Sequence, residues 1–400
     1  MPIFLVGGLR CQWPRGPHVR SLPVELEFDL GGLAKLAVLD ADERVRRYVM
    51  SEMDPYPAGG EPEGDPCVVI EADTTRNELQ LLDVQNPAQD ATVTGADTDG
   101  FYVLCGGRAC RLPDRIGDSR TAFHYQHGFP IWRIFGSVVR PALQISLLSR
   151  RVVALHSAAV EIESGGLVIA GWSESGKTET ALAFAEGGAR FLSDKWTMLT
   201  PDGAIAAFPT SVGVRRWVLQ YLPRLRSALP WRARAQLAAA GIAGAASRPL
   251  LARPARGRVA GLAVEAVERA TALGDRAALR LSEVRAAYGD TKASTWSAPL
   301  CGVALLTTVS GGTVKARAAD AAWAVRRLAR SAAYERRTLF ELYERAGFAF
   351  PDRELKLRGA TVAEEERLLA ERLASIPVIA VEAPFPVDPR RIADAIARSL

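Results

Sequence analysis

Several features are missing from this 400-residue sequence, and each absence narrows what the chain can be. No run of 18 apolar residues occurs, so no membrane-spanning helix is expected. The opening MPIFLVGGLR places its charge after a short apolar run, whereas a secretory signal has its charge first and a longer apolar core. Five cysteines are scattered without any C-x-x-C or His–Cys cluster at zinc spacing. We therefore expect reduced, mostly structural thiols in a cytoplasmic protein without a membrane partner.

Acidic side chains are missing from a long stretch of the chain. Residues 203–264 contain ten arginines and no aspartate or glutamate, whereas residues 25–100 carry eighteen acidic side chains against five basic ones. A basic stretch can bind nucleic acid, an acidic peptide or phosphates, or it can be a solvated face that attracts the acidic part of the chain. No zinc finger, clear helix-turn-helix or aromatic-interleaved RNA motif is visible, which disfavours nucleic acid.

Apolar patterning predicts an α/β (α+β) protein with two domains. Over residues 1–125, short apolar runs alternate with proline, glycine and aspartate turns, which predicts a β-rich N-terminal lobe. Apolar residues at helical spacing over 129–148 predict a connecting helix at the start of the second domain, residues 126–400. An arginine-rich insert at about 215–258 contains four prolines and is expected to form short helical pieces.

The second domain alternates strand and helix patterns. RVVAL, SAAVEI and GGLVIAG are expected to be strands, followed by a helix up to Gly187–Gly188 and a strand RFL that ends at Ser193–Asp194. WTML and AIAAF continue the strand pattern. The C-terminal part predicts a strand (CGVALLTTV), two helices (AADAAWAVRRLARSAAYERR and VAEEERLLAERLA), a strand (IPVIAVEAPF) and a last helix (DPRRIADAIARSL).

The most informative stretch is GWSESGKTET, residues 171–180, which fits the G-x-x-x-x-G-K-[ST] pattern of a phosphate-binding loop. Glycines let consecutive backbone N–H groups curl around phosphate oxygens, the lysine adds a cation, the hydroxyl holds Mg²⁺, and the next helix points its N-terminus at the anion. Lysine is only 6 of 400 residues, so a chance match is expected in roughly one in two hundred such chains. The residues predicted to bind the nucleotide phosphates are Gly171, Ser173, Glu174, Ser175, Gly176, Lys177, Thr178 and Glu179.

With its flanks, this loop resembles the catalytic core of the HPr serine kinase/phosphorylase family, which shares its P-loop fold with ATP-dependent phosphoenolpyruvate carboxykinase. The similarity covers LHSAAVEIESGGLVIAGWSESGKTETALAFAEGGARFLSDKW, with His156 21 residues before Lys177 and Asp194 17 residues after it. The ending SIPVIAVEAPF is also similar to the closing segment of such kinases, which include kinases of precursor peptides. The acidic lobe and the arginine-rich insert lie outside the resemblance.

The resemblance implies roles for individual residues. Lys177 and the loop amides would hold the β- and γ-phosphates of ATP, and Thr178 and Asp194 would bind Mg²⁺. Asp194, at the end of a strand neighbouring that of the loop, could also accept the proton of a substrate hydroxyl. His156 would orient the nucleophile or accept a proton near neutral pH. The plainer alternatives are a histidine satisfied by a backbone carbonyl and an acid in a turn.

Two positions depart from the family pattern. Lys195 stands where the family has the second acid of an Asp-Asp pair, and Glu174 stands where it has a loop glycine. The resemblance implies that the paired acids divide metal binding and proton acceptance. Here a single carboxylate could do both, Glu174 could compensate for the missing acid, or catalysis could be weak. Lys195 could instead hold an acidic or phosphorylated group. Further candidate substrate or phosphate contacts, with a solvated surface position as the alternative for each, are Arg215, Arg216, Arg256 and Arg258.

Three functions compete on these residues. The first is an ATP- and Mg²⁺-dependent kinase that phosphorylates a hydroxyl, most simply a serine, on a peptide or small protein, where an acidic acceptor would suit the basic insert. The second is a kinase of a small molecule such as free serine or a sugar. The third is a non-catalytic ATP-binding regulator in which Glu174 and Lys195 mark decay. Related kinases often form rings or dimers, so the resemblance also implies a homo-oligomer.

Overall fold

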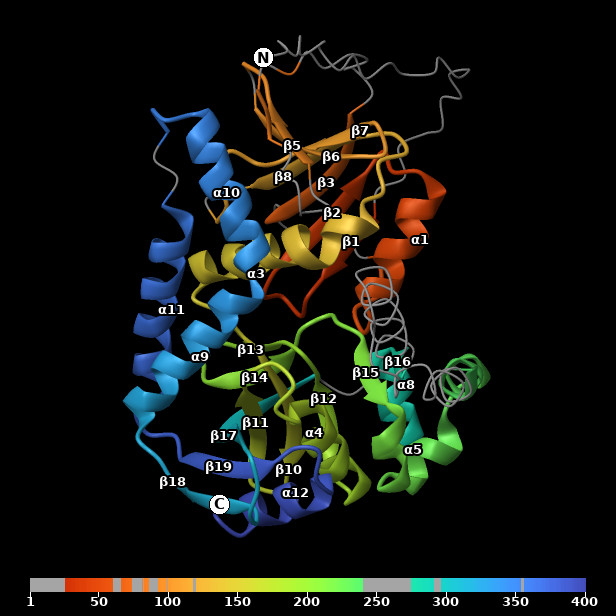
Figure 1. The fold of residues 1–400 in the computed structure, drawn as a ribbon, viewed down its shortest axis with the longest axis vertical. Coiled ribbons are helices and arrows are strands. Elements are labelled where there is room, and N and C mark those ends of the chain that lie inside the picture. The colour runs from red at the N-terminus through yellow and green to blue at the C-terminus, as the bar shows by residue number, and fades with distance from the viewer. Residues whose placement is uncertain are drawn as a thin grey trace, which may run out of the picture. The chain divides into compact units, whose positions relative to one another are not determined.

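The computed structural model describes residues 26–59, 66–73, 81, 83–85, 93–98, 100–117, 120–239, 275–290, 296–353 and 356–400. They form a mixed α/β structure, as the apolar patterning predicts, in two compact units (Figure 1). Unit 1 comprises Met1–Ala154 and Ala329–Glu371, and unit 2 comprises Leu155–Leu328 and Arg372–Leu400. Among the described helices, none combines the length and the apolar character needed to cross a membrane.

Unit 1 is built on an eight-stranded sheet in the order β1-β2-β3-β8-β7-β6-β5-β4. Its strands are β1 (Leu26–Asp29), β2 (Lys35–Leu39), β3 (Val68–Asp73), β4 (Asp83–Gln85), β5 (Val93–Ala96), β6 (Phe101–Cys105), β7 (Arg108–Arg111) and β8 (Thr121–Gln126). The strands β2, β3 and β8 run parallel, and the other neighbouring pairs are antiparallel. The predicted β-rich lobe is therefore present, and it also contains α1 (Glu43–Glu52), which the sequence patterns did not predict.

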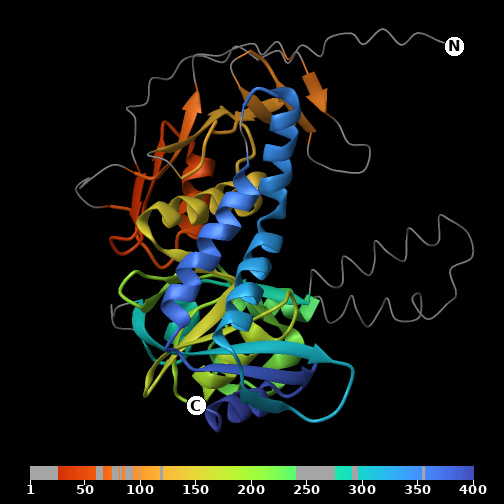
Figure 2. The same cartoon turned by 90° about the vertical axis from the view of Figure 1, so that its left-hand side faces the viewer.

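Helices of unit 1 extend the unit beyond the predicted boundary at 125/126. The expected connecting helix is a continuous helical stretch made of α2 (Trp132–Ile134), the π-helical η1 (Phe135–Val139), α3 (Arg140–Ser146) and the 3₁₀ turn η2 (Leu147–Arg150). Since α3 packs against β3 and β8, this stretch belongs to unit 1. The long blue helices in Figure 2 include α10 (Arg337–Ala349) and α11 (Leu357–Leu373).

A buried ion pair links the helices of unit 1. The guanidinium of Arg336 is fully buried and pairs with the carboxylate of Glu365, which is 1% exposed. It also donates to Oε1 of Gln144 (2.8 Å) and to the carbonyl oxygen of Ala154 (2.9 Å). A buried charge is tolerated only when it is paired and hydrogen-bonded in this way.

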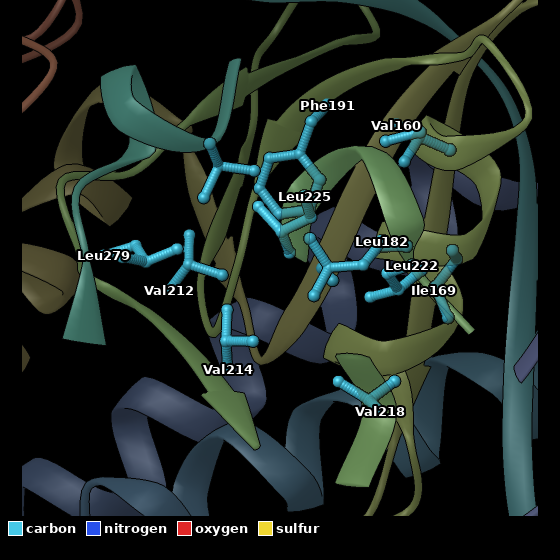
Figure 3. Close-up of a cluster of buried hydrophobic side chains, with 14 of the residues drawn as sticks. Val160, Ile169, Leu182, Phe191, Val212, Val214, Val218, Leu222, Leu225 and Leu279 are labelled. Atoms are coloured by element: carbon cyan, nitrogen blue, oxygen red, sulfur yellow. The ribbon is translucent and has the colours of Figure 1, made fainter. Parts of the chain in front are cut away.

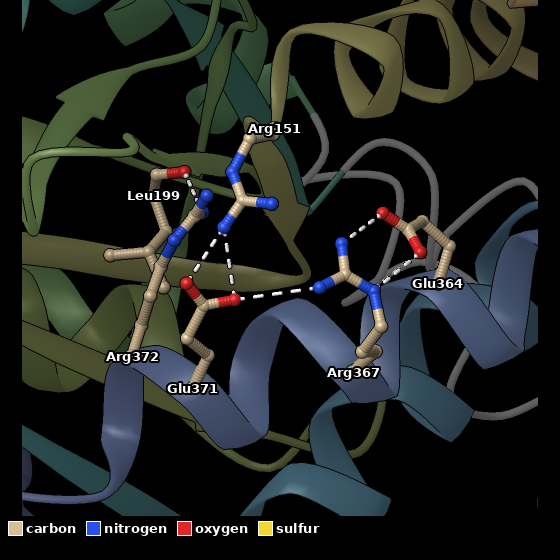
Figure 4. A network of polar contacts seen from close by, with 6 residues as sticks. All are labelled: Arg151, Leu199, Glu364, Arg367, Glu371 and Arg372. Atoms are coloured by element: carbon tan, nitrogen blue, oxygen red, sulfur yellow. Dashed lines mark hydrogen bonds and ion pairs between the residues drawn. The ribbon is translucent and has the colours of Figure 1, made fainter.

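An exposed network follows α11 near its C-terminal end (Figure 4). Within unit 1, Glu371 accepts from Arg151 (2.7 Å) and lies 3.5 Å from Arg367, which also pairs with Glu364 (2.6 Å). Such solvent-exposed pairs contribute little individually, about 0–1 kcal/mol. Within unit 2, Arg372 donates to the carbonyl oxygen of Leu199 at 2.9 Å, so the end of α11 is attached to the fold of that unit.

Unit 2 contains the phosphate-loop motif in a mixed sheet. Its path runs β12-β10-β11-β17-β14-β13-β9, and β19 pairs with both β17 and β18. The strands are β9 (Val153–Leu155), β10 (Ser157–Ile162), β11 (Gly165–Gly171), β12 (Arg190–Ser193), β13 (Thr197–Leu199), β14 (Ala204–Ala207), β17 (Ser297–Val309), β18 (Lys315–Ala318) and β19 (Val378–Pro384). The central strands β11, β17 and β19 are parallel. Every strand predicted from the second-domain patterns is present, and the short, exposed β18 was not predicted.

One topological expectation was wrong. Asp194 follows β12, and β12 pairs with β10 rather than with β11, the strand that leads into the loop. The reason is the tight β10–β11 hairpin, because its first strand, β10, lies antiparallel between β11 and β12. Asp194 therefore reaches the loop from two strands away.

In unit 2, this sheet is contacted by helices α4 (Lys177–Glu186), α8 (Leu281–Ala287) and α12 (Pro389–Ala397). The described part of the unit also contains α5 (Pro223–Ala228) and the first part of α9 (Ala321–Glu335). Ala181, Leu182 and Ala185 of α4 are fully buried, and Figure 3 shows Leu182 in the core with Ile169 of β11 and Phe191 of β12. Apolar side chains that come after β14 in the chain, including Val212 and Leu225, pack into the same core.

The arginine-rich insert is described as far as residue 239. It begins at the end of β15 (Val212–Arg215), which pairs with β16 (Arg276–Leu279), and continues through the 3₁₀ helix η3 (Arg216–Gln220), α5 and a helix at 231–239. The prediction of short helical pieces is confirmed for this part. Residues 240–258 lie outside the described residues.

Candidate nucleotide site

The GWSESGKTET stretch forms a strand–loop–helix unit. β11 ends at Gly171, and α4 begins at Lys177 with Gly176 as its N-cap. Gly176 has a φ of +91°, and a Cβ atom there would lie 3.1 Å from the ring of Phe385. A Cβ on Gly171 would lie 2.7 Å from the carbonyl oxygen of Leu306. Close packing and the positive φ of Gly176 thus favour glycine at both positions of the motif. Helix α4 begins directly after the second glycine, and a helix N-terminus is a favourable site for an anion.

Glu174 keeps a backbone conformation that glycine adopts readily. Its φ is +62°, in the left-handed region, where a residue with a Cβ costs about 1–2 kcal/mol. Its carboxylate, in a side chain that is 71% exposed, accepts from Nη2 of Arg215 at 2.7 Å. The charge that looks out of place in the sequence is therefore neutralised by an arginine of the predicted substrate-contact set.

Lys177 is folded back over the loop. Its side chain is buried, and Nζ donates to the carbonyl oxygens of Gly171 (3.1 Å) and Trp172 (2.8 Å). The ammonium group is thereby held at the loop itself, beside the backbone that would surround the phosphates. Exchanging carbonyl oxygens for phosphate oxygens would replace dipoles by full negative charges, which bind an ammonium more strongly.

Thr178 and Asp194 meet across the loop. Thr178 Oγ1 donates to Oδ1 of Asp194 at 2.7 Å, and Asp194 is 1% exposed. The backbone carbonyl of Asp194 accepts from Thr210 Oγ1 at 2.6 Å, which fixes the turn after β12. Within the described part of the chain, Oδ2 of Asp194 and Oγ of Ser175 are buried without a hydrogen-bond partner.

These atoms fit the magnesium ion that the motif implies. A hydroxyl and a carboxylate are oxygen donors of the kind Mg²⁺ prefers, and Mg²⁺ commonly takes only one or two protein ligands beside phosphate and water. The orphaned Oδ2 of Asp194 gives the site a buried acceptor that a cation or a donated proton would satisfy. No group of three or more His, Cys, Asp or Glu side chains suited to a metal occurs among the described residues, so a metal here would depend on the nucleotide for further ligands.

Glu179 is a second buried acid at this site. It lies one residue after Thr178 on α4 and is 7% exposed. Burial, and next the negative charge of Asp194, raise the pKa of Glu179, while Arg215, whose Nε lies 3.9 Å from its Oε1, acts in the opposite direction. The sequence patterns placed Glu179 among the phosphate-binding residues, and in the structure its carboxylate lies within the electrostatic reach of Asp194 and Arg215.

His156 and Lys195 flank Asp194 in different ways. His156 is buried between β9 and β10, and its ring lies 5.5 Å from that of Trp196. Lys195 has a φ of +65° and is exposed in the turn that follows Asp194. The second position of the family's acidic pair thus faces solvent here, which leaves Asp194 as the buried carboxylate of this turn.

The predicted arginines separate into three groups. Arg215 joins the site through Glu174 and Glu179, whereas Arg216 pairs with Asp275 at 3.1 Å. Arg256 and Arg258 lie outside the described residues. Sequence reasoning missed Phe385 and Thr210 as parts of the site. Phe385 lies in SIPVIAVEAPF, which the resemblance had singled out, and Thr210 lies between the predicted strand AIAAF and Arg215. Their partners are 209 and 16 residues away along the chain.

No protein-family model and no curated protein matches the chain. A functional assignment therefore rests on the residues and on the geometry of unit 2.

Proposed function

We propose that this chain is an ATP- and Mg²⁺-dependent kinase of the HPr serine kinase/phosphorylase type, with the phosphoenolpyruvate carboxykinase-like P-loop fold, that phosphorylates a hydroxyl on a peptide or small protein. The observation that carries the proposal is the 2.7 Å hydrogen bond from Thr178 of the loop to the buried Asp194. It unites the hydroxyl of a phosphate loop with a strand-end carboxylate, the pair by which P-loop proteins hold their metal ion.

In the proposed reaction, Lys177 leaves the loop carbonyls for the β- and γ-phosphates, and the backbone N–H groups before α4 bind the same oxygens. Mg²⁺, held by Thr178 and Asp194, would neutralise charge on the phosphates. The acceptor hydroxyl must lose a proton, and Oδ2 of Asp194 is a buried acceptor at the loop that has no hydrogen-bond partner among the described residues. His156, packed against Trp196, would position the acceptor or take the proton in turn.

Replacing Asp194 by alanine tests this proposal. Transfer to the correct acceptor, followed as a mass gain of about 80 Da per phosphate, should be abolished while Mg²⁺–ATP binding remains measurable by calorimetry. Asp202→Ala is a matched control, because Asp202 is an exposed acid in a nearby turn of unit 2, and it should keep full activity. Full turnover by Asp194→Ala would exclude the proposed role.

The same assay separates the competing functions. A small-molecule kinase would consume ATP with free serine or a sugar and no peptide present. A regulator would bind ATP and raise its melting temperature without transferring phosphate to any acceptor. If Mg²⁺–ATP does not bind to the wild-type chain at all, the nucleotide site itself is refuted.

A further inference from the structure

A surface hollow of about 250 Å³ lies in unit 2 between the loop that follows β17, the end of β19 and helix α12. Its walls include Val314, Pro384, Val387, Arg391, Asp394 and Arg398. We propose that this hollow binds the nucleoside end of the nucleotide. The inference rests on the proposed nucleotide site, because it assigns a position to the part of ATP that the loop does not hold.

The sheet topology places the hollow and the loop at the same edge. β11, β17 and β19 are parallel neighbours, with Gly171 opposite Leu306 and Val309 opposite Pro384. The phosphate loop follows β11, residues 310–314 follow β17, and residues 385–388 follow β19. In parallel α/β sheets, ligands bind outside the carboxyl ends of the strands, which is where these three loops meet.

A direct packing contact joins the two features. The ring of Phe385 lies against Gly176, so that a Cβ on this glycine would be 3.1 Å from the ring. Pro384 precedes Phe385 in the chain and Val387 follows two residues later, and both line the hollow. Asp194 reaches the loop from β12, on the opposite side of β11 from β17 and β19. A triphosphate with its γ-phosphate toward Asp194 would therefore extend its sugar and base toward the hollow.

The chemistry of the walls suits a nucleoside. Val314, Pro384 and Val387 supply an apolar surface for the flat base, as ligand pockets commonly do. Asp394 offers a carboxylate to the ribose hydroxyls, and Arg391 stands one turn before it on α12. Among the described residues, the guanidinium groups of Arg391 and Arg398 form no hydrogen bond or ion pair, so they are available to the ligand.

The experiment compares Mg²⁺–ATP with Mg²⁺–tripolyphosphate, which has the phosphates but no nucleoside, by calorimetry. Wild-type protein should bind ATP more tightly. Val387→Trp, which fills the hollow, and Arg391→Gln, which removes a guanidinium at an exposed position, should each weaken ATP at least about tenfold and leave tripolyphosphate unchanged, a difference of about 1.4 kcal/mol. Arg326→Gln, an exposed arginine on α9 that does not line the hollow, is the matched control and should change neither affinity.

Each other outcome is decisive. Unchanged ATP affinity in Arg391→Gln and Val387→Trp would overturn the inference and leave the phosphate site intact. Equal loss of both ligands in these variants would also overturn it, because the effect would then act on the phosphates. Failure of wild-type protein to bind either ligand would refute the proposed function itself.

Discussion

Arg215 lies between two acids of the phosphate loop, with Nη2 2.7 Å from Glu174 and Nε 3.9 Å from Glu179. Glu174 is an exposed residue on the loop itself, and Glu179 is buried on the helix that follows. The guanidinium group of Arg215 is thus paired with carboxylates. Phosphate oxygens would have to compete with Glu174 for this cation.

Replacing Glu174 by glutamine should therefore strengthen nucleotide binding. The change removes a negative charge beside the phosphates and releases Arg215, and we expect the Kd for Mg²⁺–ATP to fall about three- to tenfold. Stability should change by less than about 1 kcal/mol, since the ion pair is exposed. Calorimetry measures the affinity, and Arg215→Gln should shift it in the opposite direction. Weaker binding in Glu174→Gln would show that its carboxylate assists the nucleotide.

Gly176→Ala should destabilise unit 2 through two separate causes. The left-handed φ of +91° disfavours any Cβ, and the new methyl group would lie 3.1 Å from the ring of Phe385. Gly188→Ala is a matched control, because Gly188 has a φ of +106° but nothing within 4 Å of the added Cβ. Because of backbone strain, we expect the free energy of unfolding to fall by about 1–3 kcal/mol in each variant, and to fall more in Gly176→Ala than in Gly188→Ala. Chemical denaturation measures both. Equal losses would show that Phe385 moves aside freely.

Glu179→Gln should make stability less dependent on pH. Burial raises the pKa of Glu179 in the folded state, so folding favours its protonated form. The stabilisation of the folded state by protonated Glu179 is fully present below the unfolded-state pKa near 4.5. It is lost as pH rises through the folded-state pKa. The glutamine variant should thus be more stable than wild type at pH 7.5 and show no advantage at pH 4, as measured by urea unfolding. Glu163→Gln, at an exposed turn, should show neither effect.

Arg336→Met should be one of the most damaging substitutions in unit 1. It leaves the carboxylate of Glu365 buried without its cation, and breaking a buried pair costs about 3–5 kcal/mol. The double variant Arg336→Met, Glu365→Leu should recover much of this loss, because no uncompensated charge then remains. Arg337→Met, at the exposed neighbouring position, should be nearly neutral. A double variant as unstable as Arg336→Met alone would show that shape, not charge, dominates here.

The thiols of the described chain should differ in reactivity. Cys67 and Cys110 are buried, and burial raises the pKa of both thiols, whereas Cys105 and Cys301 are partly exposed. In a Cys11→Ser background, a thiol reagent should label Cys105 and Cys301 in the native protein and the other two only after unfolding. Peptide mass mapping identifies the labelled sites. Rapid labelling of Cys110 would contradict the tight packing of β7.

Local patterns predicted the second-domain strands and the helix of the phosphate loop, because both periodicity and glycine spacing are local signals. They missed α1, in which only Val45 and Val49 are buried, so the apolar period is faint. They also missed α10, although its apolar positions Leu339, Phe340 and Tyr343 are buried. Only the turn at Arg336 separates α10 from α9, the helix that the patterns did predict.

At the site, the sequence predicted which residue types would meet phosphate but not which would meet one another. The link between Thr178 and Asp194 followed from the family resemblance, and the structure brings both together even though β12 is not the neighbour of β11. The pairing of Glu174 with Arg215 depends on the return of β15 to the loop, 41 residues later. No local period carries such information, because it is fixed by the order of strands.

The division into two units has a practical consequence for dissecting the protein. The backbone passes from one unit to the other at 154/155, 328/329 and 371/372. A fragment that starts at 126 would retain α3 while removing β3 and β8, the strands that α3 covers. We therefore expect such a deletion to expose apolar surface and to aggregate, so that isolating unit 2 requires cuts on both sides of 329–371 and a designed linker to rejoin the ends.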